Sequence, residues 1–339
     1  MLIFMSKKSN KAQHSKVLAL LEEQGVRGYL TEFGGRPVVV AIECLPGCSV
    51  NEPALQDAAA EVEGVEEVVD VFEPYQLCSK RLCPEGSVIK VRDFSVGNGT
   101  FGFIAGPCTI ENEKQVLETA KLVKKAGAAA LRGGAFKPRT SPYAFQGMKL
   151  EGLKILQKVQ KETGLAIITE AMSPEEVELV SEYADIVQIG TRNAQNYRLL
   201  EACGRARVPI LLKRGFSCTL DEFLMSAEYI LAGGNERVIL CERGIRTFET
   251  YVRYTMPIGV IPALKIATHL PIVVDPSHAA GRADLVPSIS FAATAAGADG
   301  LLVEVHPDPK KALCDGRQSL TPDEFAGMVK ICRKIKNAL

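Results

Sequence analysis

Several features are missing from this chain of 339 residues, and each absence excludes a class of protein. It has no tryptophan and no excess of either charge, since 40 lysines and arginines face 40 aspartates and glutamates. A protein that follows a nucleic-acid backbone normally carries a basic excess or a basic stripe. We therefore expect no nucleic-acid partner, and any cluster of cations must act locally.

Long hydrophobic runs are also missing. No run approaches the ~20 apolar residues that a membrane-spanning helix needs. The first ten residues, MLIFMSKKSN, carry their charges after the short apolar stretch, which is the reverse of a secretory signal. The hydrophobic content of 47% is typical of a globular chain with one large or two unequal domains. We expect a cytoplasmic protein with no membrane partner.

Most of the ten cysteines are scattered singly, as reduced buried thiols often are. Two pairs differ: Cys44 and Cys48 in CLPGC, and Cys78 and Cys83 in CSKRLC. Together they could supply four thiolates to a zinc ion. Their loop spacings are longer than those of most structural zinc sites, so unconnected thiols are the favoured interpretation.

The first 75 residues predict a small domain of their own. The pattern indicates a strand at 1–5, a helix at 11–25, strands at 27–33 and 36–44, a helix at 52–64 and a strand at 65–72. This βαββαβ order predicts a ferredoxin-like α+β fold, with helices on one face of an antiparallel sheet. Residues 76–100 then predict a connecting β-hairpin.

Three glycines in that connection, Gly97, Gly99 and Gly102, match the dinucleotide-binding pattern G-x-G-x-x-G. The pattern requires a strand before it and a helix that opens inside it. Here an apolar, β-rich run, FGFIAGP, follows instead. We therefore predict a turn.

From residue 101 to 339, short apolar runs alternate with amphipathic helices. Eight runs predict strands: FGFIAGP, AAALRGG, LAIITEA, IVQIG, PILLKR, RVILCER, PIVVDPSH and GLLVEVH. Three helices open with a capping-box pattern, at Ser173 and Glu176, Thr219 and Glu222, and Thr321 and Glu324. Eight such units over a length near the ~250 residues typical of the fold predict an α/β (β/α)8 TIM barrel.

The reacting groups of such barrels lie where the strands end. The predicted strand ends carry polar residues in every case: Cys108, Arg132, Glu170, Gln188 with Arg192, Lys213 with Arg214, Glu242 with Arg243, Asp275 with His278, and Glu304 with His306. Lys137 and Arg139 follow closely after Arg132. We predict that these side chains share one mouth.

The cations of this mouth predict an anionic ligand. They are Arg132, Lys137, Arg139, Arg192, Lys213 and Arg243. Several cations at one point repel one another unless a polyanion joins them. Phosphate and carboxylate groups suit the planar fork of arginine and the compact charge of lysine. A solvated surface loop is the alternative for Lys137 and Arg139 alone, and their place on the barrel argues against it.

A second set of residues predicts a metal site. Cys108, His278, Glu304 and Asp315 offer one thiolate, one imidazole and two carboxylates. Manganese, iron, cobalt or zinc accepts this mixture, whereas magnesium and calcium seldom accept a thiolate. Taken singly, each residue has an ordinary alternative as a buried thiol, a loop histidine, an ion-pair partner or a turn residue. The prediction therefore rests on the set.

These strand ends and their loops carry a resemblance to a known family. The segments are AGPCTIE, LRGGAFKPRTSPYAFQG, QIGTRNAQN, LLKRG, LCERGIRTFE, VDPSHAAGR and VEVHPDPKKALCDGRQSL. They resemble the 3-deoxy-D-arabino-heptulosonate 7-phosphate (DAHP) synthases of type I beta, and the likeness covers the whole barrel. This family condenses phosphoenolpyruvate with erythrose 4-phosphate at a divalent metal, as the first step of the shikimate pathway.

The resemblance implies a role for each residue of the mouth. Five cations would surround phosphoenolpyruvate: Arg132, Lys137, Arg192, Lys213 and Arg243. Arg139, Thr140 and Ser141 would bind the phosphate of the sugar. Cys108 and His278 would act at the reacting centre as metal ligands, and Lys137 or the metal would stabilise or protonate the aldehyde oxygen. Glu170, Glu242 and a metal-bound water are open candidates for the group that activates water.

Two other functions compete with this one. Related synthases on the same fold use arabinose 5-phosphate, but they usually carry Lys-Ala-Asn-Arg where this chain reads Lys137, Pro138, Arg139 and Thr140. A catalytically silent barrel that senses phosphorylated metabolites is the second alternative. A sensor would be expected to lack a ligand or the lysine, and neither is missing here.

The N-terminal domain resembles the ACT-type regulatory domains of the type I beta synthases. The resemblance implies inhibition by tyrosine or phenylalanine, in a homotetramer in which domains of different subunits pair. The alternative is a domain that only aids assembly.

We further expect Cys314, next to Asp315, to lie near enough to Cys108 for a disulfide when no metal is bound.

Overall fold

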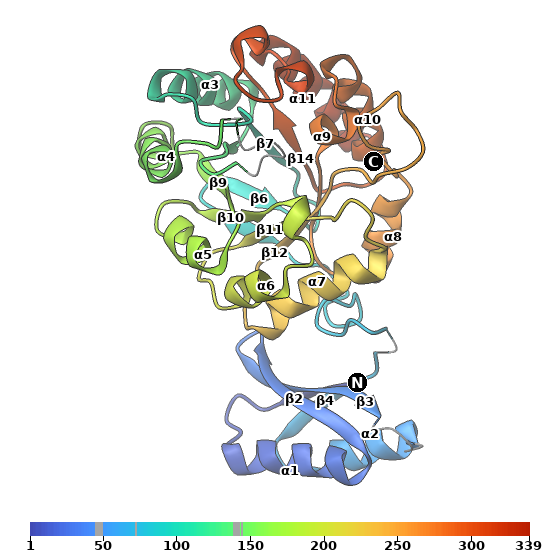
Figure 1. The fold of residues 1–339 in the computed structure, drawn as a ribbon. Coiled ribbons are helices and arrows are strands. Elements are labelled where there is room, and N and C mark those ends of the chain that lie inside the picture. Colours follow the sequence, from blue (N-terminus) through green and yellow to red (C-terminus); the bar gives the residue numbers. More distant parts are fainter. Residues whose placement is uncertain (45–49, 72, 138–142, 144) are drawn as a thin grey trace.

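The computed structural model describes residues 1–339 except 45–49, 72, 138–142 and 144, and it has two parts (Figure 1). A small antiparallel sheet with two helices forms the lower part, and a closed parallel barrel of eight strands forms the upper part. Both predicted fold classes are thus confirmed. The division of the chain at residues 75 and 100 stays a prediction.

The small sheet has the strand order β2-β3-β1-β4. Its elements are β1 (Leu2–Met5), α1 (Lys11–Glu23), β2 (Val26–Phe33), β3 (Arg36–Cys44), α2 (Glu52–Ala60) and β4 (Val65–Val69). The two helices cover the face that points away from the barrel (Figure 1), where Ile3 and Val39 pack with Val17 of α1. Leu2 belongs to the core on the barrel side. Strand β1 is therefore buried on both faces.

The joint between the two parts lies on α7 (Leu220–Ala232). The Glu228 carboxylate accepts the backbone N–H groups of Gln76, Leu77 and Cys78 at 3.0, 2.7 and 3.0 Å. The Thr31 hydroxyl donates to the Ala232 carbonyl at 3.1 Å. Barrel helices run antiparallel to the strands, so the end of α7 lies at the rim opposite the carboxyl ends of the strands. The N-terminal domain is thus attached away from the mouth.

His269 is buried within this joint. Its Nε2 donates to the Leu77 carbonyl at 2.8 Å, and its Nδ1 accepts from the Ser87 hydroxyl at 2.7 Å. The edge of the Phe33 ring packs on the imidazole. Burial lowers the pKa of His269 to about 4. The joint is therefore built around a neutral histidine.

Acid is expected to weaken this joint. The unfolded chain binds a proton at His269 below its ordinary pKa, whereas the folded chain resists protonation until about pH 4. The contribution of neutral His269 to the free energy of unfolding is therefore complete above pH 6.5 and is lost as the pH falls towards 4. About 2 kcal/mol of it is lost by pH 5. Between pH 8 and pH 5, the free energy of unfolding measured with urea should fall by about 2 kcal/mol more in the native chain than in His269→Gln. His14→Gln, altered on α1, should follow the native chain; equal falls in all three would contradict the account.

A hairpin closes the end of the barrel opposite the mouth. Strands β5 (Ile89–Val91) and β6 (Phe94–Val96) pair antiparallel. Ile89, Phe94 and Val96 pack with side chains from the barrel strands. Gly97, at φ +104°, begins the turn into the barrel, and its carbonyl accepts the Thr100 N–H. The chain thus forms a turn here, as predicted, and not a dinucleotide-binding loop. The hairpin excludes water from the bottom of the core.

The barrel closes in the order β10-β11-β12-β13-β14-β7-β8-β9. Its strands are β7 (Gly102–Gly106), β8 (Ala130–Arg132), β9 (Ala166–Ala171), β10 (Ile186–Ile189), β11 (Ile210–Lys213), β12 (Val238–Glu242), β13 (Ile272–Val274) and β14 (Gly300–Glu304). The outer helices, besides α7, are α3 (Glu113–Ala126), α4 (Lys149–Thr163), α5 (Pro174–Ser181), α6 (Tyr197–Gly204), α8 (Val260–Ala267), α10 (Val286–Ala295) and α11 (Pro322–Asn337). Among the described residues, no helix is both long and apolar enough to cross a membrane.

Two local predictions need correction. Ser173 caps α5, but the Glu176 carboxylate accepts the N–H of Met172 and not that of Ser173, so the reciprocal box is absent there. The run PIVVDPSH is not one strand, because Pro276 starts the short helix α9 (Pro276–Ala280) immediately after Asp275. His278 therefore reaches the mouth from a helix.

Candidate active site

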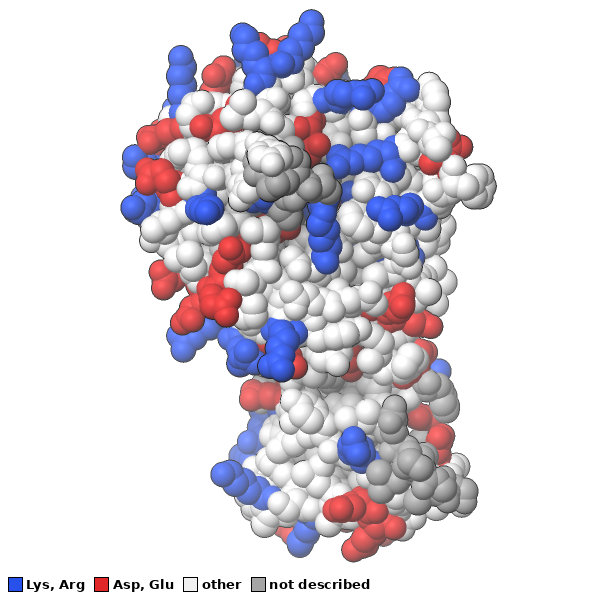
Figure 2. Space-filling view, in the orientation of Figure 1, with Lys and Arg blue, Asp and Glu red and all other residues white. Residues whose placement is uncertain are grey.

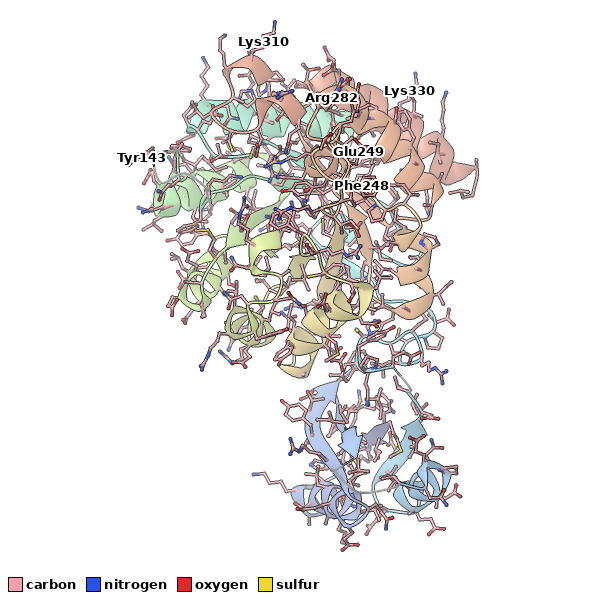
Figure 3. All side chains as sticks on the ribbon, turned by 45° about the vertical axis from the view of Figure 1, so that its right-hand side comes forward. Tyr143, Phe248, Glu249, Arg282, Lys310 and Lys330 are labelled. Carbon is pink, nitrogen blue, oxygen red and sulfur yellow. The ribbon has the colours of Figure 1, made fainter. Side chains whose placement is uncertain are left out.

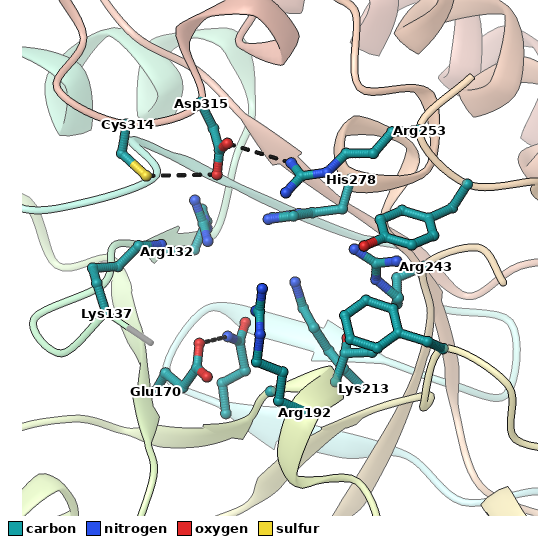
Figure 4. Close-up of a pocket in the computed structure, with 15 residues that line it drawn as sticks. Arg132, Lys137, Glu170, Arg192, Lys213, Arg243, Arg253, His278, Cys314 and Asp315 are labelled. Carbon is teal, nitrogen blue, oxygen red and sulfur yellow. Dashed lines mark hydrogen bonds and ion pairs between the residues drawn. The ribbon is translucent and has the colours of Figure 1, made fainter. Parts of the chain in front are cut away.

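The carboxyl ends of the barrel strands surround one polar pocket (Figure 4). Six cationic side chains line it: Arg132, Lys137, Arg192, Lys213, Arg243 and Arg253. The anionic lining residues among those described are Glu170 and Asp315. On the face that Figure 2 shows, both signs of charge are spread over the surface, in agreement with a net charge of zero. The concentration of cations is thus a property of this pocket.

Three of these cations, Lys137, Arg192 and Arg243, have no carboxylate partner in the described part of the chain. Arg192 and Arg243 form no ion pair there, although Arg243 is buried. The Nε atoms of Arg132 and Arg243 are buried without a hydrogen-bond partner. Burial lowers the pKa of Arg243. Unsatisfied buried donors of positive charge are costly, so the pocket is suited to an anion that supplies acceptors.

Aromatic rings support the arginines. Phe216 and Tyr254 stack with ring centroids 5.2 Å apart, and the Arg243 guanidinium lies 4.0 Å from the Tyr254 centroid. Arg192 and Arg246 lie over the Phe216 ring at 5.6 and 5.4 Å. Such contacts hold a guanidinium in place without neutralising its charge. Neither ring was predicted from the sequence to belong to the site.

Arg253 was also missed. Its Nη1 donates to Gln318 Oε1 at 2.9 Å and lies 3.3 Å from Asp315 Oδ1. It belongs to the long loop after β12, whose Phe248 points outward and is 98% exposed (Figure 3). A loop without periodicity gives no sign of which side chains turn inward. The arginine next to a tyrosine in YVRYT was the available signal.

The residues predicted to bind a metal lie together. Cys108 Sγ is 3.2 Å from Asp315 Oδ2, and His278 Nε2 is 3.4 Å from Glu304 Oε1. One ligand atom each from His278, Glu304 and Asp315 fits within 4.8 Å, and so does one each from Cys108, Cys314 and Asp315. The four predicted ligands therefore fall into two overlapping groups that share Asp315.

The chemistry of these atoms fits a cation. His278 Nδ1 lies 2.6 Å from Asp275 Oδ2, so we assign the imidazole proton to Nδ1. The lone pair of Nε2 then faces the Glu304 carboxylate. Burial lowers the pKa of His278, which favours this neutral form. An imidazole lone pair beside two carboxylates and a thiol is a suitable donor set for a divalent transition metal.

Cys108 is protonated in the absence of a metal. Its hydrogen bond with Cys314 and its burial raise its pKa well above the ordinary value for a thiol. Lys137 Nζ lies 3.0 Å from Cys108 Sγ and contacts the Cys108 carbonyl at the same distance. A metal that binds here must therefore displace the thiol proton, with a lysine cation beside the resulting thiolate.

Other predicted residues have different outcomes. Arg139, Thr140 and Ser141 lie outside the described residues, as does Cys48, and the Cys44 side chain is not described. Cys78 is buried and donates to the Leu224 carbonyl, whereas Cys83 is partly exposed. In the described part of the chain, both groups able to hold a metal are in the barrel mouth.

The two carboxylates considered for water activation differ in position. Glu242 is fully buried, and it binds Arg214 Nη1 at 2.7 Å and the N–H groups of Arg243 and Gly244. It does not line the pocket. Glu170 does, and the absence of a side chain at Gly190 leaves room for it, since a Cβ there would lie 2.1 Å from Glu170 Oε1. Of the two, only Glu170 faces the ligand space.

Comparison with known proteins identifies the family. Residues 83–339 match the model of the DAHP synthetase I family. The chain belongs to this family. It is 44% identical over 339 residues to the phospho-2-dehydro-3-deoxyheptonate aldolase of Thermotoga maritima, covering 100% of this chain and 98% of that one. The crystal structure of the Thermotoga maritima enzyme matches 99% of this chain and 97% of that one with a TM-score of 0.78.

The DAHP synthetase I chain described here also resembles a second group of enzymes, over the barrel. The 2-dehydro-3-deoxyphosphooctonate aldolase of Syntrophotalea carbinolica is 34% identical over an alignment of 263 residues, which covers 71% of this chain and 93% of that one. A truncated form of the Thermotoga maritima synthase, 48% identical, matches 78% of this chain and 97% of that one with a TM-score of 0.74. Likeness over the full length, N-terminal domain included, is thus found with the heptonate enzyme.

Proposed function

We propose that this chain condenses phosphoenolpyruvate with D-erythrose 4-phosphate and water to give 3-deoxy-D-arabino-heptulosonate 7-phosphate and phosphate, the first step of the shikimate pathway. The observation that carries the proposal is the pocket with six lining cations, of which Lys137, Arg192 and Arg243 have no carboxylate partner in the described residues. Two multiply charged anions approach each other only where cations offset their repulsion.

The cations divide between the substrates. Arg132, Lys137, Arg192, Lys213 and Arg243 hold the carboxylate and phosphate of phosphoenolpyruvate. Arg139, Thr140 and Ser141 bind the phosphate of the sugar. Carbon 3 of phosphoenolpyruvate attacks the aldehyde carbon, and Lys137 donates a hydrogen bond or a proton to the aldehyde oxygen. Water then adds at carbon 2 with Glu170 as the facing base, and phosphate leaves by cleavage of the carbon–oxygen bond.

Cys108, His278, Glu304 and Asp315 hold a divalent metal ion, with manganese, iron, cobalt or zinc as the candidates. When bound, the metal supplies Lewis-acid polarisation of a substrate oxygen. The support for this assignment is the cluster of donor atoms, with a thiol among them and an imidazole lone pair directed at carboxylates. Asp275 orients the imidazole from behind.

The sugar is tested by phosphate release. The metal-loaded chain with phosphoenolpyruvate and erythrose 4-phosphate should release phosphate and form a seven-carbon 3-deoxy sugar phosphate, seen by mass spectrometry. With arabinose 5-phosphate, release should be at least ~100-fold slower, because the pocket for the sugar phosphate must match chain length. Equal rates would favour the octulosonate activity. Binding of phosphoenolpyruvate without release with either sugar would favour the sensor.

The N-terminal domain serves as the regulatory domain, through which tyrosine or phenylalanine inhibits a homotetramer. A chain that begins at residue 83 should keep the condensation and lose the inhibition, because the domain is attached to α7 and to the linker, opposite the mouth. A start near residue 92 would remove β5 and open the bottom of the barrel. The test is the condensation rate of both chains with tyrosine and with phenylalanine. Equal inhibition of the two chains would place the effector on the barrel. A full-length chain that neither amino acid inhibits would show that the domain only aids assembly.

Oxidation is expected to inactivate the metal-free chain reversibly. Cys108 Sγ lies 3.3 Å from Cys314 Sγ, so diamide can take two electrons and two protons from the thiols as the disulfide forms. Bound metal should protect, dithiothreitol should restore activity, and Cys314→Ser should resist. The test is the activity recovered when metal is returned after different times of exposure, each variant relative to its own untreated sample. A Cys314→Ser chain that is inactivated as fast as the native chain would remove this disulfide from the account.

A further inference from the structure

The Asp275 carboxylate lies directly behind the mouth and is fully buried. Three donors converge on it. Lys213 Nζ and His278 Nδ1 both lie 2.6 Å from its Oδ2, and the backbone N–H of His278 donates to Oδ1 at 2.9 Å. One oxygen therefore joins a cation that lines the pocket to an imidazole of the predicted metal site.

The contact with His278 decides which ring nitrogen carries the proton. An imidazole that donates from Nδ1 presents an unprotonated Nε2 on its far side, where Glu304 lies. The opposite tautomer would place an N–H towards the metal site and could not bind a metal through Nε2. A carboxylate behind a ligating histidine is a common way to fix the ring and the tautomer.

The contact with Lys213 decides where its ammonium lies. Lys213 is buried, and Asp275 is its ion-pair partner in the described part of the chain. The ammonium therefore has a neutralising group on the wall side, and the rest of its donors can face the pocket.

The other carboxylates of the site have different sets of partners, although Glu304 also lies 3.4 Å from His278, on the Nε2 side. Glu304 binds Arg132 Nη1 at 2.8 Å and Gln318 Nε2 at 2.7 Å. Asp315 pairs with Arg253. Within the described residues, Asp275 is the carboxylate that contacts both a lysine of the anion pocket and the histidine.

We propose that Asp275 is a positioning residue that fixes both Lys213 for the substrate anion and His278 for the metal. The roles of Lys213 and His278 come from the proposed function. Asp275 touches neither ligand itself, so each of its effects must pass through one of these two side chains. A variant that lacks the intermediary should therefore no longer respond to a change at Asp275.

Asp275→Asn tests the arm through His278. An asparagine amide has one acceptor atom, its oxygen, and its nitrogen can only donate. It therefore cannot accept hydrogen bonds from all three groups that donate to Asp275. Equilibrium dialysis of the metal-free chain against zinc should show affinity weaker by about 10–100-fold. Asp299→Asn is the matched control, because Asp299 is also buried and paired with a lysine, Lys265, outside the mouth. Asp275→Asn combined with His278→Gln should bind zinc as His278→Gln alone does.

The arm through Lys213 is tested with phosphoenolpyruvate and the metal-free chain, by calorimetry. Asp275→Asn should bind it more weakly than the native chain, and adding the same change to Lys213→Met should have no further effect beyond about twofold. Independent, additive losses in either double variant would show that Asp275 acts by another route. So would native affinity for zinc in Asp275→Asn.

A readout in the unaltered chain remains if Asp275→Asn fails to fold. Long-range proton–nitrogen spectra distinguish the two imidazole tautomers, and His278→Gln identifies the signal among four histidines. The metal-free native chain should show His278 protonated at Nδ1; protonation at Nε2 alone would overturn the proposal. None of these measurements uses turnover, so a failed condensation assay and a failed role for Asp275 give different results.

Discussion

Cys108→Ala is expected to abolish both metal binding and the metal response of the condensation. The thiol is the soft ligand of the set and lies 3.2 Å from Asp315 Oδ2, so its loss leaves one imidazole and two carboxylates. Metal polarisation contributes several kcal/mol, so phosphate release should fall by ~10³-fold or more. Metal content after dialysis and initial rates with added manganese, cobalt, iron or zinc measure the two effects.

The matched control is Cys203→Ala. Cys203 is as buried as Cys108, but it lies in α6, away from the mouth. That variant should keep its metal and its rate even if its stability falls. The native chain treated with a strong chelator should behave as Cys108→Ala does and recover when metal is returned. Normal activity and metal content in Cys108→Ala would show that the metal site is assigned to the wrong residues.

Lys137→Met should reduce the turnover number by about 10²–10⁴-fold, with a smaller change in KM for erythrose 4-phosphate. The Lys137 ammonium lies beside Cys108 in the pocket lining, and methionine keeps most of the side-chain length but removes the charge and the proton. The aldehyde oxygen would then develop its negative charge without this donor. Steady-state rates with each substrate varied separate turnover from binding.

Lys158→Met is the control for that change. Lys158 is on the outer surface of α4 and pairs with Glu113 at 2.8 Å, with most of its side chain in solvent. Exposed pairs of this kind contribute little, so activity should stay near the native value. Retention of more than about a tenth of native turnover in Lys137→Met would assign the proton and charge stabilisation to another group.

The barrel and its strand-end residues could be predicted because both follow from local rules. Short apolar runs bounded by helix caps identify strands, and parallel strands bring their carboxyl ends to one rim. Arg132, Lys213 and His278 were found in this way. His278 nevertheless lies on a short helix, because a proline after Asp275 starts one. Its position at the rim was still predicted correctly, because a strand end and the short helix that follows it lie at the same edge of the barrel.

What escaped prediction depends on contacts between distant segments. Glu242 was considered as a base because it ends a strand, but two backbone N–H groups and Arg214 hold it in the wall. Arg253 and Tyr254 lie inside a long loop, whose inward residues follow no period. The contact of Asp275 with Lys213 joins residues 62 positions apart. Apart from the arginine next to a tyrosine in YVRYT, none of these features has a sequence pattern of its own.

The central claim is that one pocket holds the metal and phosphoenolpyruvate together, and a crystal structure with manganese and phosphoenolpyruvate tests it most directly. The account predicts an anomalous manganese peak in contact with Cys108, His278, Glu304 and Asp315. It also predicts that the phosphate and carboxylate of phosphoenolpyruvate are bound by Arg132, Lys137, Arg192, Lys213 and Arg243. A manganese peak at other residues, or phosphoenolpyruvate bound outside the circle of these five cations, would contradict it.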